Sequence, residues 1–177
     1  MKPIGALFRS IAWSGFLIGL SWCPAWAPSG ADAETATFGD WTVRCVQRET
    51  LPSCDIVQSA RQRDTGRIIM QTSIAYAPAQ DRYAVQIILP LGFLIQPGVS
   101  IHVDEKTEIK DFPVTRCEAQ GCFVEKVVET KTLAPFRSGK SGVISVVAPG
   151  GRSVSFPLSL NGFSKAMDEM TARNKKK

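Results

Sequence analysis

The sequence predicts a mostly β fold, an antiparallel β-sandwich or barrel-like domain with a C-terminal helix. Two observations support this prediction. Short segments rich in Val, Ile, Thr and Phe recur at fairly regular spacing between turn signals, as strands do. No long helical stretch separates these segments, so the parallel sheet of a βαβ fold is not expected.

The predicted strands begin at Trp41, where Trp41 and Val43 alternate with Thr42 and Arg44 in the pattern of a half-buried strand. Gly and Pro residues punctuate the sequence between most of the later strands. These later strands are expected over residues 54–60, 68–76, 83–89, 99–104, 109–114, 122–128, 142–148 and 153–160, the last two as a hairpin.

The apolar period changes to that of a helix after residue 160. Asn161 is expected to cap this helix, and residues 130–137 are predicted to form a short helix or a turn. The apolar residues at positions i, i+3, i+4 and i+7 of the C-terminal helix are Phe163, Ala166, Met167 and Met170.

The N-terminus has the three parts of a secretory signal: a basic start, an uncharged apolar run over residues 11–22, and small-x-small sites. The run is shorter than the roughly 20 residues that span a bilayer. A cleaved signal peptide is therefore favoured over a buried helix or a retained anchor. Cleavage is predicted after Ala33, with Ala27 as the alternative, which leaves residues 34–177 as a single domain.

The cysteines indicate structural disulfide bonds. Cys23 leaves with the signal peptide, and the large residue before it argues against lipid modification. Four cysteines remain, without the C-x2-C spacing of zinc sites. Four cysteines allow three pairings, and a hairpin loop over residues 118–121 favours the local one, because residues flanking such a loop come within disulfide range. The expected bonds are Cys45–Cys54 and Cys117–Cys122, each stabilising by roughly 2–3 kcal/mol.

His102, the only histidine, is the natural candidate for acid–base chemistry. Strand alternation places it on one face with Ser100 and Asp104. Three neighbours on one strand do not converge as a nucleophile, a base and an orienting group must, so we assign no catalytic residues. We also expect no metal and no cofactor, because the acidic residues match neither a calcium loop nor a glycosidase pair. Nucleic acid is not an expected partner, because basic residues do not interleave with aromatic ones.

Residues 89–98 form an unusually apolar stretch that Pro and Gly interrupt. If buried, the stretch lines the core; if exposed, it forms a partner-binding or lipid-facing patch. The partner would be an unknown protein or an envelope or host-surface component. The candidate partner-binding residues are Leu91, Phe93, Leu94 and Ile95.

The chain carries a formal net charge of +5, and part of this excess lies in its C-terminal tail. A solvated, frayed terminus is one interpretation of the tail. Peripheral contact with anionic lipid or polysaccharide is the other, since each basic residue near a charged membrane contributes about 1 kcal/mol. The basic residues of the tail are Arg173, Lys175, Lys176 and Lys177.

Several short motifs occur in a fixed order along the predicted mature chain. They are Phe38-Gly39-Asp40-Trp41-Thr42-Val43-Arg44-Cys45 with Cys54, Leu89-Pro90-Leu91-Gly92 and Pro97-Gly98-Val99 with Val103-Asp104, Arg116-Cys117 with Gly121-Cys122, and Leu158-Ser159-Leu160-Asn161-Gly162-Phe163 with Ala166. Together they resemble the invasion-associated locus B family of alphaproteobacterial envelope proteins. The resemblance implies an exported β domain that is periplasmic, outer-membrane-associated or secreted. The family is named for a role in bacterial entry into host cells, including red blood cells, and it brings no established catalytic residues.

Three functions fit these observations. The first is a non-enzymatic binding module linked to host-cell invasion or envelope function. The second is a hydrolase of envelope polymers with carboxylates that the sequence does not identify; a concave pocket with two convergent titratable side chains would distinguish it. The third is a structural or chaperone-like envelope component.

Overall fold

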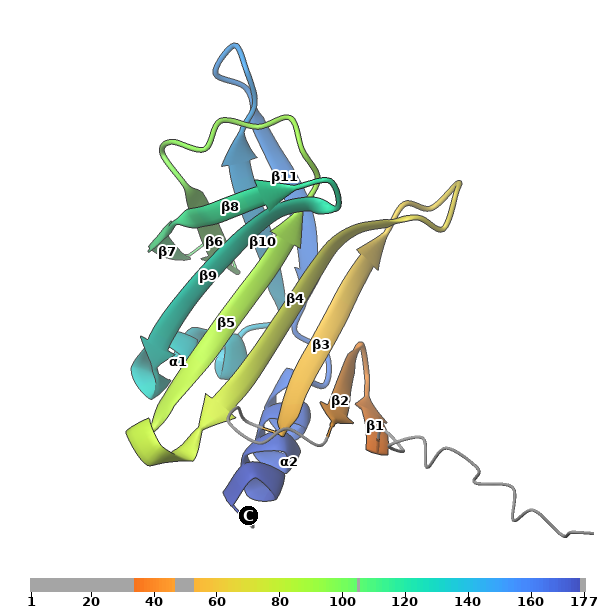
Figure 1. Cartoon of the computed structure of the whole chain (residues 1–177), viewed down its shortest axis with the longest axis vertical. Coiled ribbons are helices and arrows are strands. Elements are labelled where there is room, and N and C mark those ends of the chain that lie inside the picture. Colours follow the sequence, from red (N-terminus) through yellow and green to blue (C-terminus); the bar gives the residue numbers. More distant parts are fainter. Residues whose placement is uncertain (1–33, 47–52, 105, 176–177) are drawn as a thin grey trace, which may run out of the picture. The chain divides into compact units, whose positions relative to one another are not determined.

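The computed structural model describes residues 34–46, 53–104 and 106–175 (Figure 1). They form two antiparallel sheets, one of seven strands in the order β1-β2-β3-β4-β5-β9-β8 and one of four in the order β11-β10-β6-β7. The prediction of a mostly β, sandwich-type fold with a C-terminal helix is confirmed, and these sheets do not close into a barrel. The predicted signal peptide, residues 1–33, lies outside the described residues.

The element bounds are as follows. The larger sheet comprises β1 (Glu34–Phe38), β2 (Trp41–Cys45), β3 (Cys54–Arg61), β4 (Ile68–Ala77), β5 (Arg82–Leu89), β8 (Val114–Glu118) and β9 (Gly121–Glu129). The smaller sheet comprises β6 (Val99–Val103), β7 (Thr107–Phe112), β10 (Ser141–Val147) and β11 (Ser153–Ser159). The helices are α1 (Thr130–Ser138), α2 (Phe163–Lys175) and the short 3-10 helix η1 (Pro78–Gln80).

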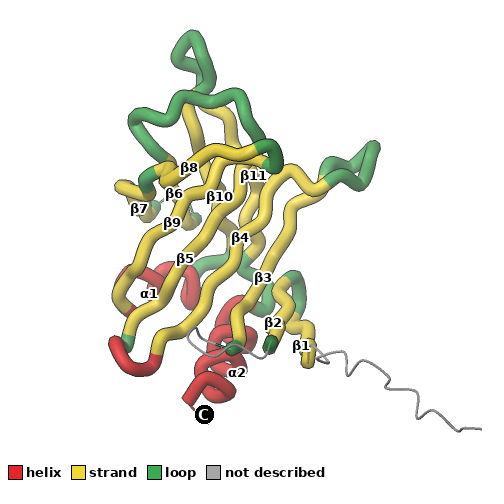
Figure 2. The backbone as a smooth tube through the Cα atoms, in the orientation of Figure 1, coloured by secondary structure: helices red, strands yellow, loops and turns green. Residues whose placement is uncertain are grey.

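Both α-helices and the smaller sheet lie against the same face of the larger sheet (Figures 1 and 2). Strand alternation gives the larger sheet this buried face: along β4, Met70, Ile74 and Tyr76 are buried, whereas the residues that alternate with them are half-exposed. The buried residues of both sheets and both helices form one continuous core. The other face of the larger sheet carries the more exposed half of each alternating strand, which includes polar side chains such as Gln86 and Glu125 and also Val127.

Two elements differ from the sequence prediction. Residues 109–114 were expected to form one strand, but the chain forms β7 in one sheet and β8 in the other, with Pro113 between them. Proline has no N–H to continue a ladder, so the change of sheet occurs there. Strand β1 was not predicted, because its pairing with β2 is decided by the Gly39–Asp40 turn rather than by strong alternation.

The predicted helix begins at Phe163, and Asn161 does not cap it. Instead the Asn161 carbonyl accepts the Asp40 N–H at 3.2 Å. Gly162, with φ +83°, lies directly against the Phe38 carbonyl, where a Cβ atom would clash. The turn between β1 and β2 and the loop before α2 are therefore packed backbone to backbone.

Polar bonds reinforce this packing. The Trp41 indole N–H and the Gln58 amide both donate to the Ser159 carbonyl at 2.9 Å, and the Ser159 N–H donates back to Gln58 at 2.9 Å. The Ser159 hydroxyl donates to Asp40 at 2.6 Å. The Trp41 and Phe163 rings meet edge to face at 5.2 Å.

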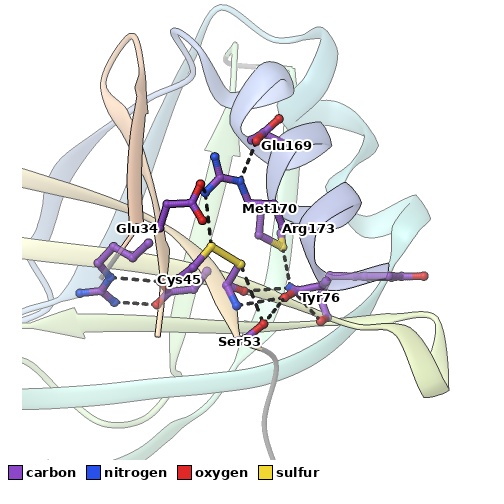
Figure 3. The surroundings of a disulfide bond; sticks show 11 residues. Glu34, Cys45, Ser53, Tyr76, Glu169, Met170 and Arg173 are labelled. Atoms are coloured by element: carbon purple, nitrogen blue, oxygen red, sulfur yellow. Dashed lines mark hydrogen bonds and ion pairs between the residues drawn. A yellow bond between two sulfur atoms is a disulfide. The ribbon is translucent and has the colours of Figure 1, made fainter. Parts of the chain in front are cut away.

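The last turn of α2 is bonded to β3 and β4 beside a disulfide bond (Figure 3). Buried Asn174 accepts from the Cys54 N–H at 2.9 Å and donates to the carbonyls of Cys54 and Tyr76 at 2.9 and 3.3 Å. Arg173 pairs with Glu34 and Glu169. We call residues 38–41, 53–54 and 158–175, which hold α2 on the larger sheet, the α2 junction.

The structure contains two disulfide bonds, Cys45–Cys54 and Cys117–Cys122, the local pairing favoured from the sequence. Both join residues that lie directly opposite each other on paired strands. The loop predicted over residues 118–121 is shorter than expected, because Glu118 and Gly121 are themselves a strand pair and only two residues turn the chain.

Candidate functional site

Three aliphatic side chains project from the loop between β5 and β6. Leu91, Leu94 and Ile95 are 57, 42 and 55 % exposed, whereas Phe93 of the same loop packs against the core. The Leu94 N–H donates to the Val147 carbonyl of β10 at 2.7 Å, which ties the loop to the smaller sheet. The structure thus separates the four predicted residues into one anchor and three exposed positions. We call Leu91, Leu94 and Ile95 the tip cluster.

Gly98 shapes the same loop. Its φ is +91°, and its N–H donates to the Ile95 carbonyl at 2.9 Å. A Cβ atom there would lie 3.0 Å from the Phe112 carbonyl, so glycine allows the loop to close onto β7. Backbone bonds at Leu94 and between Ile95 and Gly98, together with the packing of Phe93, hold the part of the loop that carries Leu94 and Ile95.

Four strand-connecting loops lie at the same end of the two sheets, and one of them carries the tip cluster. Strand registers place them together: Arg61 of β3 opposes Ile68 of β4, and Leu89 of β5 opposes Cys122 of β9. The β10–β11 turn joins them, because Val147 at the end of β10 bonds the tip loop. Figure 1 shows these loops extending beyond the strands. We call residues 61–68, 90–98, 118–121 and 148–152 the loop end.

The loop end carries exposed arginines. Arg61, Arg63 and Arg67 lie in or beside the β3–β4 turn, and Arg152 ends the β10–β11 turn. Arg61 donates to the Gly66 carbonyl at 3.0 Å and Arg67 to the Gln62 side chain at 3.4 Å. Within the described residues none of the four forms an ion pair with a carboxylate.

His102 lies on the outer face of the smaller sheet with Ser100, as expected. Its Nε2 atom is 3.2 Å from the Ser100 hydroxyl and 3.7 Å from the Glu108 carboxylate on β7. Glu108 also pairs with Lys110 at 2.9 Å. A catalytic triad needs the serine and the carboxylate on opposite ring nitrogens. Here one nitrogen meets both groups, so the cluster lacks the relay of a serine hydrolase.

Asp104 does not share that face, which corrects the sequence expectation. Its φ is +48°, so the chain has left the strand, and its carboxylate accepts the N–H groups of Lys140 and Ser141 at 2.9 Å each. These backbone bonds, first that of Lys140 and then that of Ser141, lower the pKa of Asp104. Asp104 therefore holds the loop before β10 instead of orienting His102.

A cavity of about 520 Å³ lies on the outer face of the larger sheet, with Asp55 and Glu125 among its lining residues. It is the feature that a polymer hydrolase requires, two carboxylates in one hollow. However, Asp55 is engaged by Arg44 through two bonds of 3.1 and 2.6 Å. Glu125 accepts from Arg116, and this bond is the main reason that its pKa is lowered.

A glycosidase needs one carboxyl group with a raised pKa to act as the acid. The lowered pKa of Glu125 is the opposite of this requirement. The cavity on the larger sheet therefore does not present the chemistry of the hydrolase alternative. In the described parts of the chain, no group of three or more His, Cys, Asp or Glu side chains is arranged to hold a metal ion.

A family model described as Invasion associated locus B (IalB) protein matches residues 41–171. The chain belongs to the IalB family. The resemblance that the sequence motifs indicated is therefore confirmed.

Among its relatives is an "Invasion protein B homolog" of Brucella abortus (strain 2308), 27 % identical over 175 residues, 98 % of each chain. "Invasion protein B" of Bartonella bacilliformis is 27 % identical over 152 residues, 84 % of this chain and 80 % of that protein. A crystal structure of invasion associated protein b from Bartonella henselae matches with a TM-score of 0.71 at 26 % identity, covering 81 % of this chain and 99 % of that one.

Two groups of the motifs lie in contrasting structural settings. Residues 38–41 and 158–163 pack against each other in the α2 junction, which explains them by folding rather than chemistry. Residues 89–92 and 97–99 frame the tip cluster. Of these two groups, the second borders the exposed aliphatic side chains of the tip cluster.

The sequence analysis did not identify three features of the structure: Glu108 beside His102, the arginines of the loop end, and buried Asn174. Glu108 escaped notice because its position opposite His102 depends on strand register. The sequence indicates that the arginines of the loop end lie in or near turns. It does not bring them together, because they are separated by up to 91 residues. Asn174 continues the helical period of Met167 and Met170, so its burial could have been inferred from spacing.

The basic tail is largely accounted for within the domain. Arg173 is ion-paired with Glu34 and Glu169, and the Lys175 ammonium is 5.6 Å from the centre of the Tyr76 ring. Lys176 and Lys177 lie outside the described residues. Neither described α-helix is long and apolar enough to cross a bilayer.

Proposed function

We propose that this IalB-family protein is an exported envelope protein that acts as a non-enzymatic binding module in host-cell invasion or envelope function. Its contact surface is the tip cluster, anchored by Phe93. Residues 1–33 direct export and are removed in the process, and the mature domain acts in the periplasm, at the outer membrane or outside the cell.

The observation that carries this proposal is the exposure of three aliphatic side chains on a loop whose backbone is bonded at Leu94 and between Ile95 and Gly98. An aliphatic cluster that the domain leaves in water lowers the free energy of association when a partner covers it. The bonded backbone reduces the entropy lost on binding. The packing of Phe93 gives the loop this rigidity without covering its tip.

Two further observations support the export and invasion parts. Two disulfide bonds favour an oxidising compartment, because thiols stay reduced in the cytosol. The relatives from Brucella abortus and Bartonella bacilliformis are named for invasion. Binding is favoured over hydrolysis because the carboxylates of the larger cavity are engaged by arginines.

The test is site-specific photo-cross-linking in intact cells. A photo-reactive residue at Leu94 should trap an envelope or host-surface component, and the matched residue at Val127 should not. Val127 is a suitable control because it is 55 % exposed but lies on β9 near the opposite end of the strand. Equal cross-linking from both positions, or none from Leu94, would contradict the proposal. Mass spectrometry of the exported protein should find Glu34 as its first residue.

A further inference from the structure

We propose that the surface contacted by the tip cluster is an anionic lipid bilayer, with the arginines of the loop end binding its headgroups. This inference rests on the proposed function and names its partner. It develops the lipid-facing alternative considered for residues 89–98, and it concerns the loop end and not the basic tail, for which peripheral membrane contact was one of two interpretations.

The tip cluster has the chemistry of a shallow membrane insertion. Leu91, Leu94 and Ile95 are purely aliphatic, and Ile68, 46 % exposed at the β3–β4 turn, adds a fourth aliphatic side chain to the same end. Such side chains gain free energy in the acyl region of a bilayer without needing a specific polar match. The Leu94–Val147 backbone bond keeps the loop ordered before it meets the lipid.

The charge of the loop end complements an anionic surface. The β3–β4 and β10–β11 turns carry Arg61, Arg63, Arg67 and Arg152 against the single carboxylate of Asp64. Glu118, at the β8–β9 turn, is paired with Arg116 at 2.7 Å, an arginine that it shares with Glu125. Guanidinium groups bind phosphate through paired N–H donors, which suits them to phospholipid headgroups.

The distribution of these arginines favours a bilayer over a protein groove. They lie on hairpins of different sheets, the β3–β4 hairpin in the larger sheet and the β10–β11 hairpin in the smaller. A protein partner would have to match charges at both hairpins and the apolar tip at once. A bilayer presents negative charge everywhere on its surface, so it meets this arrangement without a fixed pattern.

Arg173 and Lys175, the basic tail residues that the structure describes, lie away from this contact. Tyr76, beside Lys175, lies at the end of β4 opposite Ile68, so the described part of the tail is at the other end of the domain from the tip cluster. Figure 1 shows α2 at the end of the domain remote from these loops.

The test is co-sedimentation of the exported protein with vesicles of phosphatidylcholine, with and without a minor fraction of phosphatidylglycerol. We expect binding to the anionic vesicles, weaker binding to phosphatidylcholine alone, and loss of binding as salt rises. Replacing Leu91, Leu94 and Ile95 together by Ser should reduce vesicle affinity at least ~10-fold. Arg63→Gln and Arg152→Gln should each reduce it about fivefold.

Val127→Ser and Lys165→Gln are the matched controls, since both residues are exposed and lie outside the loop end; both should bind as the parent does. Circular dichroism should show that the triple variant is folded, and the arginine variants provide an independent test. Absence of binding to anionic vesicles, or full binding by the triple variant, would overturn the lipid inference. If Leu94 then still cross-links to a protein in cells, the proposed function stands without it; if neither occurs, both fall.

Discussion

The α2 junction and the loop end differ in how far their polar groups are hydrogen-bonded or ion-paired, and their apolar groups buried, within the chain. In the α2 junction, Asn174 makes bonds to both backbone groups of Cys54, and Trp41 is fully buried with its N–H bonded. At the loop end, aliphatic side chains stand in water and four arginines have no carboxylate partner among the described residues.

This difference indicates that the α2 junction stabilises the fold, whereas the loop end is available for binding. Free energy of folding is concentrated where burial and hydrogen bonding coincide. The apolar and charged groups of a binding surface are not engaged within the domain before a partner binds. Such a surface therefore contributes little to the free energy of folding. Substitutions in the two regions should therefore separate stability from binding.

The largest expected effect is that of Gly162→Ala. The new Cβ atom would meet the Phe38 carbonyl at a φ of +83°, which combines backbone strain with overpacking. We expect a loss of about 3–5 kcal/mol in the free energy of unfolding, measured by chemical denaturation.

Gly150→Ala is the matched control for this substitution. Its φ is +87°, but nothing lies within 4 Å of the position of its Cβ atom. We expect a loss of only about 1 kcal/mol from strain. Equal losses in the two variants would show that the packing of Gly162 in the α2 junction does not matter.

Asn174→Ala should have the next largest effect. It removes three side-chain bonds to the backbone of Cys54 and Tyr76 and leaves those groups buried without partners. We expect a loss of about 2–3 kcal/mol, whereas Lys165→Ala on the exposed face of α2 should change stability by less than about 0.5 kcal/mol. A loss for Asn174→Ala as small as that of the control would refute the role given to this side chain.

Acid should weaken the domain through Glu125 and Asp104, which lie outside the α2 junction. The pKa values of both are lowered in the folded state, from 4.5 and 3.8, by Arg116 and by the Lys140 N–H respectively. Folding is therefore favoured above these ordinary values, and this contribution is lost as pH falls through the lowered ones. At pH values below about 4, the melting temperature should decrease as the pH is lowered. This decrease should be less steep in the Glu125→Gln variant. An unchanged slope in that variant would contradict the role of the Arg116 pair.

The smallest expected effect on stability is at the loop end. Serine at Leu91, Leu94 and Ile95 removes side chains that are already exposed, so unfolding free energy should change by less than about 0.5 kcal/mol for each. Phe93→Ser in the same loop should cost more, because Phe93 packs against the core. Thermal denaturation of both variants tests this; a large loss in the triple variant would mean that the tip cluster supports the fold.

The sequence predicted more of the fold than of the site. Alternation located most strands, and the period of Phe163, Met167 and Met170 located α2. These signals are local, so they survive without knowledge of the neighbours. The tip cluster was identified as a group by its composition, but Leu94 and Phe93 could not be told apart, because their burial depends on contacts with β10 and the core.

By itself, the sequence determined the class of fold, the IalB family and the local pairing of the cysteines, since each depends on residues close together or on motifs in fixed order. Only the tertiary structure decided that Asp104 turns away from His102 and that Glu108 takes its place, because strand register sets which side chains meet. The tertiary structure also places Arg63 and Arg152 at the loop end, which carries Leu94. Such groupings arise when distant hairpins are assembled into sheets, and no local periodicity encodes them.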